Sequence, residues 1–515
     1  MEKNYDARNI ALTILCRTLE EKVPSHTALA EGLAGNAISK EDRAFIKKLV
    51  TGTVERVITL DIIIDRYSSV KTSKQKPVIR NVLRMGIYQI LFMDVPDSAA
   101  CNESVKLAKK RKFMGLSGFV NGVLRKTAAE KESIIAEING NIFADSKYND
   151  NKKSVNYRKM SFKYSLPEWI IEYFIDSFGE ERAEEAFSYF LKESTVQIRC
   201  NTNRIKPVEL LEKLENDEHI NVRVRSENEK YMIISGFDKL ESLGSFKAGS
   251  FSVQDFSSAL AIESLESDLI REYIVQRQEE EEEVVVKKEE KAGEKGSAES
   301  GISDESRISG ESKLSKESKL SKESKISEES KMYVKKNHLE ILDICAAPGG
   351  KTLNLADRLK TDGFSAHFTS CDVSENKLAK IRENIARCGI DGIECVINDG
   401  TIYNPSFSEH FDIVIADVPC SGLGVIGRKP DIKLNSSIEK IRELAQLQRS
   451  ILENAVKYVK SKGFLLFSTC TIGRIENEDN VEFIKKLGFE NIKSMQICPG
   501  GYECDGFFYS LFRKV

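Results

Sequence analysis

The 515-residue sequence has no run of about 18 uninterrupted apolar residues, the length that a membrane-spanning helix requires. It therefore predicts no membrane segment. Residues 1–15 contain Asp6 and Arg8 within an amphipathic pattern and lack the continuous apolar core of a secretory signal. We therefore expect a cytoplasmic protein.

Histidine is also scarce. The five histidines form no HxxxH pattern and the eleven cysteines contain no Cys-x-x-Cys pair, so we expect no metal site. The cysteines are odd in number and widely scattered, which is typical of reduced thiols rather than of a disulfide framework. The 77 basic and 80 acidic residues nearly cancel, so net charge neither favours nor excludes a polyanionic partner.

A chain of this length exceeds one ordinary hydrophobic core, so we expect several domains. Apolar residues at helical spacing, such as Ile10 and Ile14, predict an all-α bundle over residues 1–150. Short alternating segments separated by glycine and polar turns predict a small α/β module over residues 160–258. Within the bundle, the basic run at 109–112 is either a phosphate-binding face or an ordinary solvated helix surface.

Residues 270–336 consist largely of Glu, Lys and Ser. Such a segment has too little apolar surface to offset its chain entropy, so we expect an insertion that is disordered or at most transiently helical. Residues 337–515 then alternate apolar strands with helical stretches, the pattern of a doubly wound, Rossmann-like parallel sheet. The expected strands are 339–344, 367–371, 392–397, 411–416 and 463–468, and the expected helices are 351–359, 375–386 and 438–459.

Ligands of such sheets bind beyond the carboxyl ends of the strands. The first strand runs into a loop of small residues that lets the backbone approach a ligand closely, without the spacing of a P-loop or of GxGxxG. Asp372 ends the second strand, where a carboxylate can accept both ribose hydroxyls, and Asp399 follows the third, near an adenine edge. The expected nucleoside site therefore comprises Asp372, Asp399 and the loop residues Cys345, Ala346, Ala347, Pro348, Gly349, Gly350 and Lys351.

Two cysteines follow neighbouring strands on the same edge. The fourth strand delivers Asp417 and Cys420, and the fifth delivers Cys470. Each cysteine alone is more often a buried inert thiol, but a pair beside a nucleoside site indicates nucleophilic chemistry.

These segments resemble the RNA cytosine-5 methyltransferase family, which uses S-adenosylmethionine. The upstream domain is similar to the helical RNA-binding domain of the NusB type, and the combination resembles the bacterial 16S rRNA cytosine-5 methyltransferases. The resemblance rests on Ala346-Ala347-Pro348-Gly349-Gly350-Lys351-Thr352, Asp417-Val418-Pro419-Cys420-Ser421-Gly422, Arg428-Lys429-Pro430-Asp431, Ser468-Thr469-Cys470-Thr471, Val253-Gln254-Asp255, Asp505-Gly506-Phe507-Phe508, Asp42-Arg43, Leu83-Arg84-Met85-Gly86 and Phe119-Val120-Asn121-Gly122.

The resemblance implies a role for each candidate residue. The loop 345–351 with Asp372, Asp399 and Asp417 would line the methyl-donor site. Cys470 would be the nucleophile, Cys420 would assist release of the methylated base, and Asp417 would also lie near the polar edge of the cytosine. The implied partner is 16S rRNA, either free or in an early assembly particle, bound by both the helical domain and the small module.

Two positions depart from the family pattern. Leu434 stands where an aromatic residue is usual, and Glu55 stands where an arginine is usual. Three other functions remain open: a non-catalytic RNA-binding or ribosome-assembly protein, a cytosine-5 methyltransferase of another RNA, and a DNA cytosine methyltransferase. The intact pair of Cys420 and Cys470 disfavours the first and the last.

Overall fold

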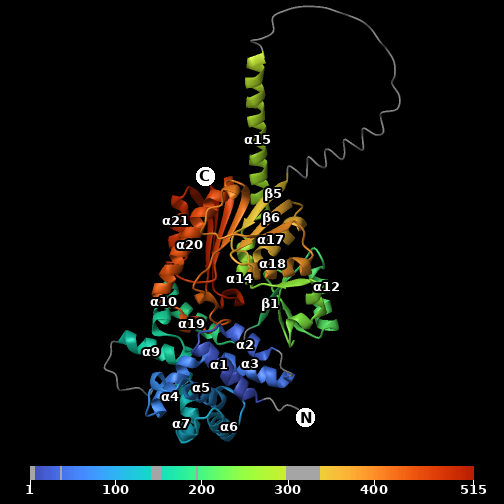
Figure 1. The fold of residues 1–515 in the computed structure, drawn as a ribbon. Coiled ribbons are helices and arrows are strands. Elements are labelled where there is room, and N and C mark those ends of the chain that lie inside the picture. The colour runs from blue at the N-terminus through green and yellow to red at the C-terminus, as the bar shows by residue number, and fades with distance from the viewer. Residues whose placement is uncertain (1–5, 35–37, 141–151, 193–194, 297–336) are drawn as a thin grey trace, which may run out of the picture.

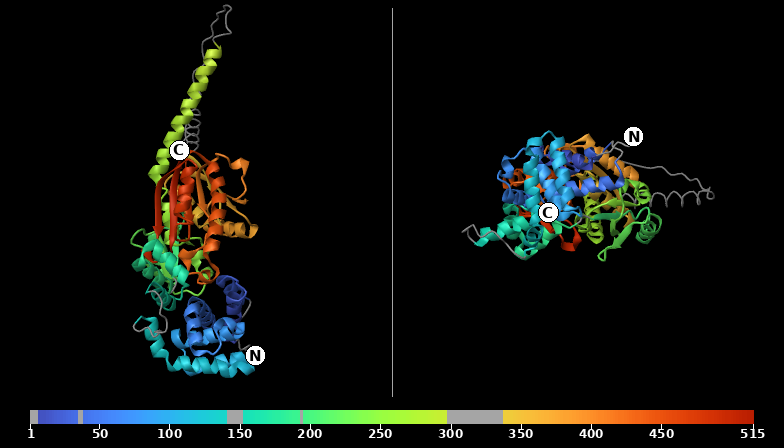
Figure 2. Two further views of the ribbon diagram at one scale, coloured as in Figure 1. Left: turned by 90° about the vertical axis from the view of Figure 1, so that its left-hand side faces the viewer. Right: turned by 90° about the horizontal axis from the view of Figure 1, so that it is seen from below.

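The computed structural model describes residues 6–34, 38–140, 152–192, 195–296 and 337–515 (Figure 1). A helical domain lies at one end of the molecule, and a large mixed sheet flanked by helices forms the body (Figures 1 and 2). No helix in these described ranges is long and apolar enough to cross a membrane.

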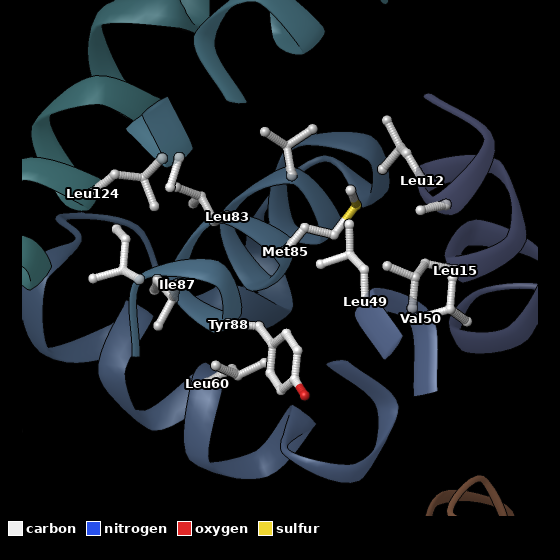
Figure 3. Close-up of a cluster of buried hydrophobic side chains, with 14 of the residues drawn as sticks. Leu12, Leu15, Leu49, Val50, Leu60, Leu83, Met85, Ile87, Tyr88 and Leu124 are labelled. Carbon is white, nitrogen blue, oxygen red and sulfur yellow. The ribbon is translucent and has the colours of Figure 1, made fainter. Parts of the chain in front are cut away.

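The N-terminal domain is an all-α bundle built around helix α5 (Pro77–Phe92). Pro77 starts this helix, where its missing N–H costs no hydrogen bond, and almost every residue from Ile79 onward is buried. Its side chains Leu83, Met85 and Ile87 lie among those of the surrounding helices (Figure 3). These are α1 (Ala7–Leu19), α2 (Ser25–Leu33), α3 (Lys40–Glu55), α4 (Val57–Tyr67), α6 (Asp97–Lys110), α7 (Ser117–Ala129) and α8 (Lys131–Ile138).

Three further helices connect this bundle to the rest of the chain: α9 (Lys152–Tyr164), α10 (Glu168–Phe178) and α11 (Glu180–Phe190). Their shared core contains Phe174 and Phe187 and extends to Leu423 and Ile472 of the C-terminal domain. These helices therefore support the loops that follow two strands of the large sheet.

The small module contains a four-stranded antiparallel sheet in the order β2-β3-β1-β4. Its strands are β1 (Val196–Cys200), β2 (Asn221–Val224), β3 (Tyr231–Ser235) and β4 (Phe251–Val253), and its helices are α12 (Pro207–Glu212), α13 (Gly244–Lys247) and α14 (Phe256–Glu263). A core of Ile198, Leu210, Ile234 and Phe251 fills the space beneath this sheet.

The prediction of disorder from residue 270 is wrong for residues 270–296, which belong to the 30-residue helix α15 (Ser267–Gly296). Ile270 and Tyr273 on its first turns are buried in the core of the large sheet. Tyr273 and Arg277 donate hydrogen bonds of 2.7 and 2.8 Å to the fully buried Asp412. The averaged Glu-rich composition of the segment conceals this apolar and anchoring start. Residues 297–336 lie outside the described ranges.

The C-terminal domain is a seven-stranded sheet in the order β10-β11-β9-β8-β5-β6-β7, in which the first two strands run antiparallel to their neighbours. Helices α14, α15 and α17 cover one face, and α20 and α21 cover the other. The five expected strands and three expected helices are confirmed. The elements are β5 (His338–Asp343), α17 (Gly350–Thr361), β6 (Ser365–Asp372), α18 (Glu375–Cys388), β7 (Ile393–Ile397), β8 (Phe411–Asp417), α19 (Ile432–Asn435), α20 (Ile438–Tyr458), β9 (Val459–Thr469), α21 (Glu478–Lys486), β10 (Phe489–Ile497) and β11 (Phe507–Lys514).

Candidate active site

The carboxyl ends of β8 and β9 bring the two cysteines together. In this parallel pair Asp417 lies opposite Ser468, and Cys420 and Cys470 follow within three residues of that point. The two Sγ atoms are 3.1 Å apart, and the backbone N–H of Cys470 donates to Cys420 Sγ at 3.3 Å. Both thiols therefore emerge on one edge of the sheet, as the sequence predicts. In addition, they are in direct contact.

The surroundings of the two thiols differ in charge. A hydrogen bond from Cys420, together with the positive charges of Lys429 and Lys351, holds the pKa of Cys470 below its usual value, although burial and Asp417 oppose this. The same contact with Cys470, burial and the negative charges of Glu476 and Asp417 raise the pKa of Cys420 well above its usual value. Of the two sulfurs, Cys470 is therefore the easier to deprotonate, and Cys420 holds its proton more tightly.

Asp417 is held in place from two sides. Lys351 Nζ lies 2.6 Å from its Oδ2, and Ser468 Oγ donates to its Oδ1 at 2.7 Å. The Lys351 ammonium also lies 4.9 Å from the centroid of the Phe507 ring, which closes the site from β11. The carboxyl group is thus fixed in position at the point where β5, β8 and β9 meet.

A glycine contact fixes the loop that carries Cys420. The Gly424 N–H donates to the Cys470 carbonyl at 3.2 Å, and the Gly506 N–H donates to the Gly424 carbonyl at 2.9 Å. A Cβ atom on Gly424 would lie 2.1 Å from the Gly506 carbonyl oxygen. Only glycine permits this approach, which ties the Cys420 loop to both Cys470 and the start of β11.

Glu476 also contributes to the site, although it did not emerge from the sequence. Its buried carboxylate accepts hydrogen bonds of 2.9 Å from the Ser421 N–H and from Gln448 Nε2, and burial raises its pKa. Gln448 Nε2 also donates to the Pro419 carbonyl at 2.9 Å. The loop around Cys420 is therefore held by a buried polar network. The sequence does not reveal this role, because a buried acidic residue that holds the Cys420 loop has the same sequence pattern as a solvated acidic residue in a loop.

A cavity of about 210 Å³ adjoins Asp417. It is lined by Asp343, the loop residues from Cys345 to Pro348, Gly350, Lys351 and, from the small module, Gln254 and Asp255. Asp343 Oδ2 accepts from Thr352 Oγ1 at 2.7 Å, while its buried Oδ1 has no hydrogen-bond partner in the part of the chain that the structure describes. Burial raises the pKa of Asp343 to about 7.

The remaining two candidates lie further along the same edge. Asp372 ends β6 and accepts from the N–H groups of Val373 and Ala347 at 2.8 and 3.3 Å, so it contacts the loop that follows β5. Asp399 follows β7 and accepts from the Thr401 N–H and Oγ1 at 2.9 and 2.7 Å. These hydrogen bonds lower the pKa of Asp399. The structure places both aspartates on the predicted edge, but neither is part of the cavity wall described above.

The segment 428–433 joins the site to the other two domains. Arg428 forms ion pairs with Asp255 of the small module, at 2.6 Å, and with Asp505. Asp431 accepts from Ser25 at the start of α2, and Lys433 donates to the carbonyl of Glu55 at the end of α3. Glu55, which differs from the usual arginine of the family, therefore lies at the interface between the helical domain and the C-terminal domain. Leu434 is exposed.

Comparison with protein families identifies both ends of the chain. Residues 332–513 match the model of the family described as "16S rRNA methyltransferase RsmB/F". The chain belongs to the RsmB/F methyltransferase family. Residues 5–129 match the model of the NusB family, which corresponds to the N-terminal bundle. The RsmB/F assignment makes the chain an S-adenosylmethionine-dependent rRNA methyltransferase.

Curated relatives match along the whole length of this RsmB/F member. It is 27% identical to the "Probable ribosomal RNA small subunit methyltransferase B" of Bacillus subtilis, over 99% of both chains. It is 25% identical to the "Ribosomal RNA small subunit methyltransferase B" of Proteus mirabilis, over 100% of both chains. Among solved structures, the crystal structure of PH0851 superposes with a TM-score of 0.67 at 20% identity and covers 100% of both chains, which supports the overall fold.

The cavity beside Asp417 suits the donor of an RsmB/F enzyme. S-adenosylmethionine carries a sulfonium and an ammonium group, and the unpartnered Asp343 Oδ1 offers an anionic acceptor inside the cavity wall. The small side chains of Ala346 and Ala347 leave the loop backbone open to close approach. Within the described residues, no group of three or more His, Cys, Asp or Glu side chains is placed to hold a metal ion.

Proposed function

We propose that this RsmB/F member methylates carbon 5 of a cytosine in 16S rRNA, with Cys470 as the nucleophile and Cys420 as the group that assists product release. The observation that carries the proposal is the 3.1 Å contact between a sulfur whose pKa is lowered and one whose pKa is raised. A pair of thiols with separate charge states suits a reaction that needs one thiolate and one proton-carrying group.

Carbon 5 of cytosine is a poor nucleophile until carbon 6 has been attacked. Addition of the Cys470 thiolate forms an Sγ–C6 bond and turns the ring into an enamine whose carbon 5 can take a methyl group. Asp417, fixed by Lys351 and Ser468, is assigned to the polar edge of the ring, where it stabilises the developing charge. S-adenosylmethionine supplies the electrophilic methyl group.

Release then requires that carbon 5 lose its proton and that the Sγ–C6 bond break. The proton of carbon 5 passes to a base such as solvent water, and the electron pair of the broken Sγ–C6 bond returns to Cys470. We assign Cys420 to the second event, in which its S–H group hydrogen-bonds the leaving thiolate of Cys470. The buried network of Ser421, Glu476 and Gln448 keeps the Cys420 loop in position while the ring is attached. The residues assigned to the donor are Asp343, the loop 345–351, Asp372 and, at the far end, Asp399.

A denaturing gel with labelled 16S rRNA and the donor tests these assignments, because only a covalent complex survives denaturation. Cys470→Ala should abolish methylation and give no adduct. Cys420→Ala should still permit attack and methyl transfer but stall elimination, so that protein accumulates on the RNA. An adduct from Cys470→Ala and none from Cys420→Ala would reverse the two roles.

The identity of the substrate is tested separately. Bisulfite sequencing of rRNA from a deletion strain should show the loss of one 5-methylcytosine in 16S rRNA. Methylation of naked 16S rRNA and of an early assembly particle in vitro then distinguishes between the two forms of the substrate. Transfer to another RNA, with unchanged 16S rRNA, would contradict the proposal.

A further inference from the structure

Gln254 lies in the segment between β4 and α14, outside the large sheet, and lines the cavity beside the donor loop. Its side chain is 5% exposed. Neither its amide oxygen nor its amide nitrogen has a hydrogen-bond partner among the residues that the structure describes. Burying an amide without partners costs free energy, so a ligand that satisfies both atoms gains that free energy back.

The backbone around Gln254 is fixed from three directions. Its N–H donates to the Gln197 carbonyl at 3.1 Å, and the preceding Val253 pairs with Ile198 of β1. The following residue, Asp255, forms the N-cap of α14 and the ion pair with Arg428. The backbone that carries the unpartnered amide is therefore fixed beside the cavity by hydrogen bonds on both sides of Gln254.

The same wall carries the unpartnered Asp343 Oδ1. A carboxylate and an amide together offer two acceptors and one donor, a set that matches an ammonium group beside a carboxylate. Lys351, the cation in this wall, is already paired with Asp417. The chemistry of an α-amino acid matches this wall, because an ammonium group can donate to Asp343 Oδ1 and to the Gln254 oxygen, and a carboxylate can accept from the Gln254 N–H group.

A pyrimidine edge fits the Gln254 amide less well. An amide can turn over to pair with either cytosine or uracil, so it would not by itself select the base, and a pyrimidine would leave Asp343 Oδ1 without a cationic partner. We propose that Gln254 binds the amino-acid end of the methyl donor, so that the small module supplies one wall of the donor site. This inference rests on the proposed donor site, but it is independent of the cytosine chemistry.

Calorimetry with two product-like ligands tests the proposal on the full-length protein without RNA. S-adenosylhomocysteine carries the amino-acid end, whereas 5′-methylthioadenosine lacks it. Gln254→Met keeps the length of the side chain but removes both hydrogen-bonding groups. It should weaken S-adenosylhomocysteine binding roughly tenfold and leave methylthioadenosine binding unchanged. Gln254→Asn, which draws the amide back by one methylene, should show the same selective loss.

Val208→Ala is the control, because this side chain belongs to α12 of the same small module, is 58% exposed and lies outside the cavity wall. It should leave both affinities unchanged. Unchanged S-adenosylhomocysteine binding in Gln254→Met would overturn the proposal and leave the target base as the ligand of this amide. An equal loss for both ligands would also overturn it, because it would indicate a general distortion. If the wild-type protein bound neither ligand, the donor site itself would be wrong, which is a separate failure.

Discussion

The ammonium of Lys433 donates a hydrogen bond to the backbone carbonyl of Glu55, the last residue of helix α3. A cation at the carboxyl end of a helix complements its dipole. Nearby, Asp431 contacts Ser25 at the amino end of α2, where a negative charge is favoured. The short segment beyond Arg428 is thus docked between two helix ends of opposite polarity, and this docking joins the bundle to the catalytic domain.

This docking should depend on pH. Lys433 is 3% exposed, and burial lowers its pKa to about 7 in spite of the opposing charge of Glu55, while the charge of Arg56 adds to the lowering. The unfolded lysine binds its proton up to about pH 10.4, so between pH 7 and 10 the unfolded state holds more protons and stability should rise with pH. The contribution to the slope is at most about 1.4 kcal/mol per pH unit.

Urea unfolding of the full-length protein between pH 6 and 10 measures this slope. In Lys433→Met the free energy of unfolding should no longer rise with pH as it does in the wild type. Lys440→Met, which changes an exposed lysine on the neighbouring helix α20, should keep it. If the free energy of unfolding changes with pH in the same way in the wild type and in Lys433→Met, Lys433 keeps its ordinary pKa in the interface.

The contact between the two thiols should set the reactivity of Cys470. Cys420→Ala removes the S–H donor, so the pH at which half of Cys470 is alkylated by iodoacetamide should rise. Cys420→Ser keeps a donor and should give a smaller rise. Mass spectrometry of the Cys470 peptide reads both outcomes, and Cys101→Ala in the helical domain is the control. An unchanged profile in Cys420→Ala would mean that Lys351 and Lys429 alone determine the reactivity.

The basic run at 109–112 divides into two groups. Lys110 forms an ion pair with Asp6 at 2.9 Å, and Arg111 donates to the Asn9 carbonyl at 3.1 Å, so both support the start of α1. Lys109 and Lys112 are exposed. We predict that Lys109→Glu with Lys112→Glu weakens RNA binding and lowers the slope of log K against log salt by about 1.4 to 1.8, because two phosphate contacts are lost.

Filter binding of 16S rRNA fragments over a range of salt concentrations measures that slope. Lys485→Glu with Lys486→Glu changes the net charge equally on exposed residues of α21 and should leave the slope unchanged. If both double variants behave alike, the run at 109–112 is an ordinary solvated surface.

Two deletions should separate the anchored start of α15 from the rest of the insertion. Removal of 284–331 with a short flexible joint keeps Tyr273 and Arg277 on Asp412, so the free energy of unfolding should stay the same. Removal of 276–331 takes away Arg277 and should cost about 1 to 3 kcal/mol, because one partner of a buried carboxylate is lost. Denaturant unfolding measures both, and Arg277→Gln in the intact chain should reproduce the loss. Equal stability of the two shortened chains would show that the Arg277 contact contributes nothing.

The elements that sequence predicts well are those whose signal is local. The run 411–416 is apolar and becomes β8, and the spacing of Asp417, Cys420 and Cys470 after their strands places them on one edge. Contacts between distant segments carry no such signal. Glu476 and Gln254 look like ordinary polar residues until folding brings them to the Cys420 loop and to the cavity beside Asp417.

The start of α15 shows where a prediction from average composition fails. The mean polarity of 270–336 predicts disorder, yet Ile270, Tyr273 and Ile274 alone bury enough apolar surface to fix the first turns of a helix. Strand β10 lacks a clear apolar alternation, since only its ends, Phe489 and Ile497, are buried, and its pairing with β11 depends on tertiary context.

Asp412 and Asp417 stand at opposite ends of the same strand, β8. One holds the base of α15, and the other lines the cavity beside the loop 345–351. Helix α15 therefore leaves the body on the side away from the helical domain (Figures 1 and 2). A fluorophore, an affinity handle or a surface tether attached along the outer part of this helix would leave the catalytic edge facing free solution. The insertion thus offers a natural attachment point for single-molecule measurements of this enzyme on its RNA.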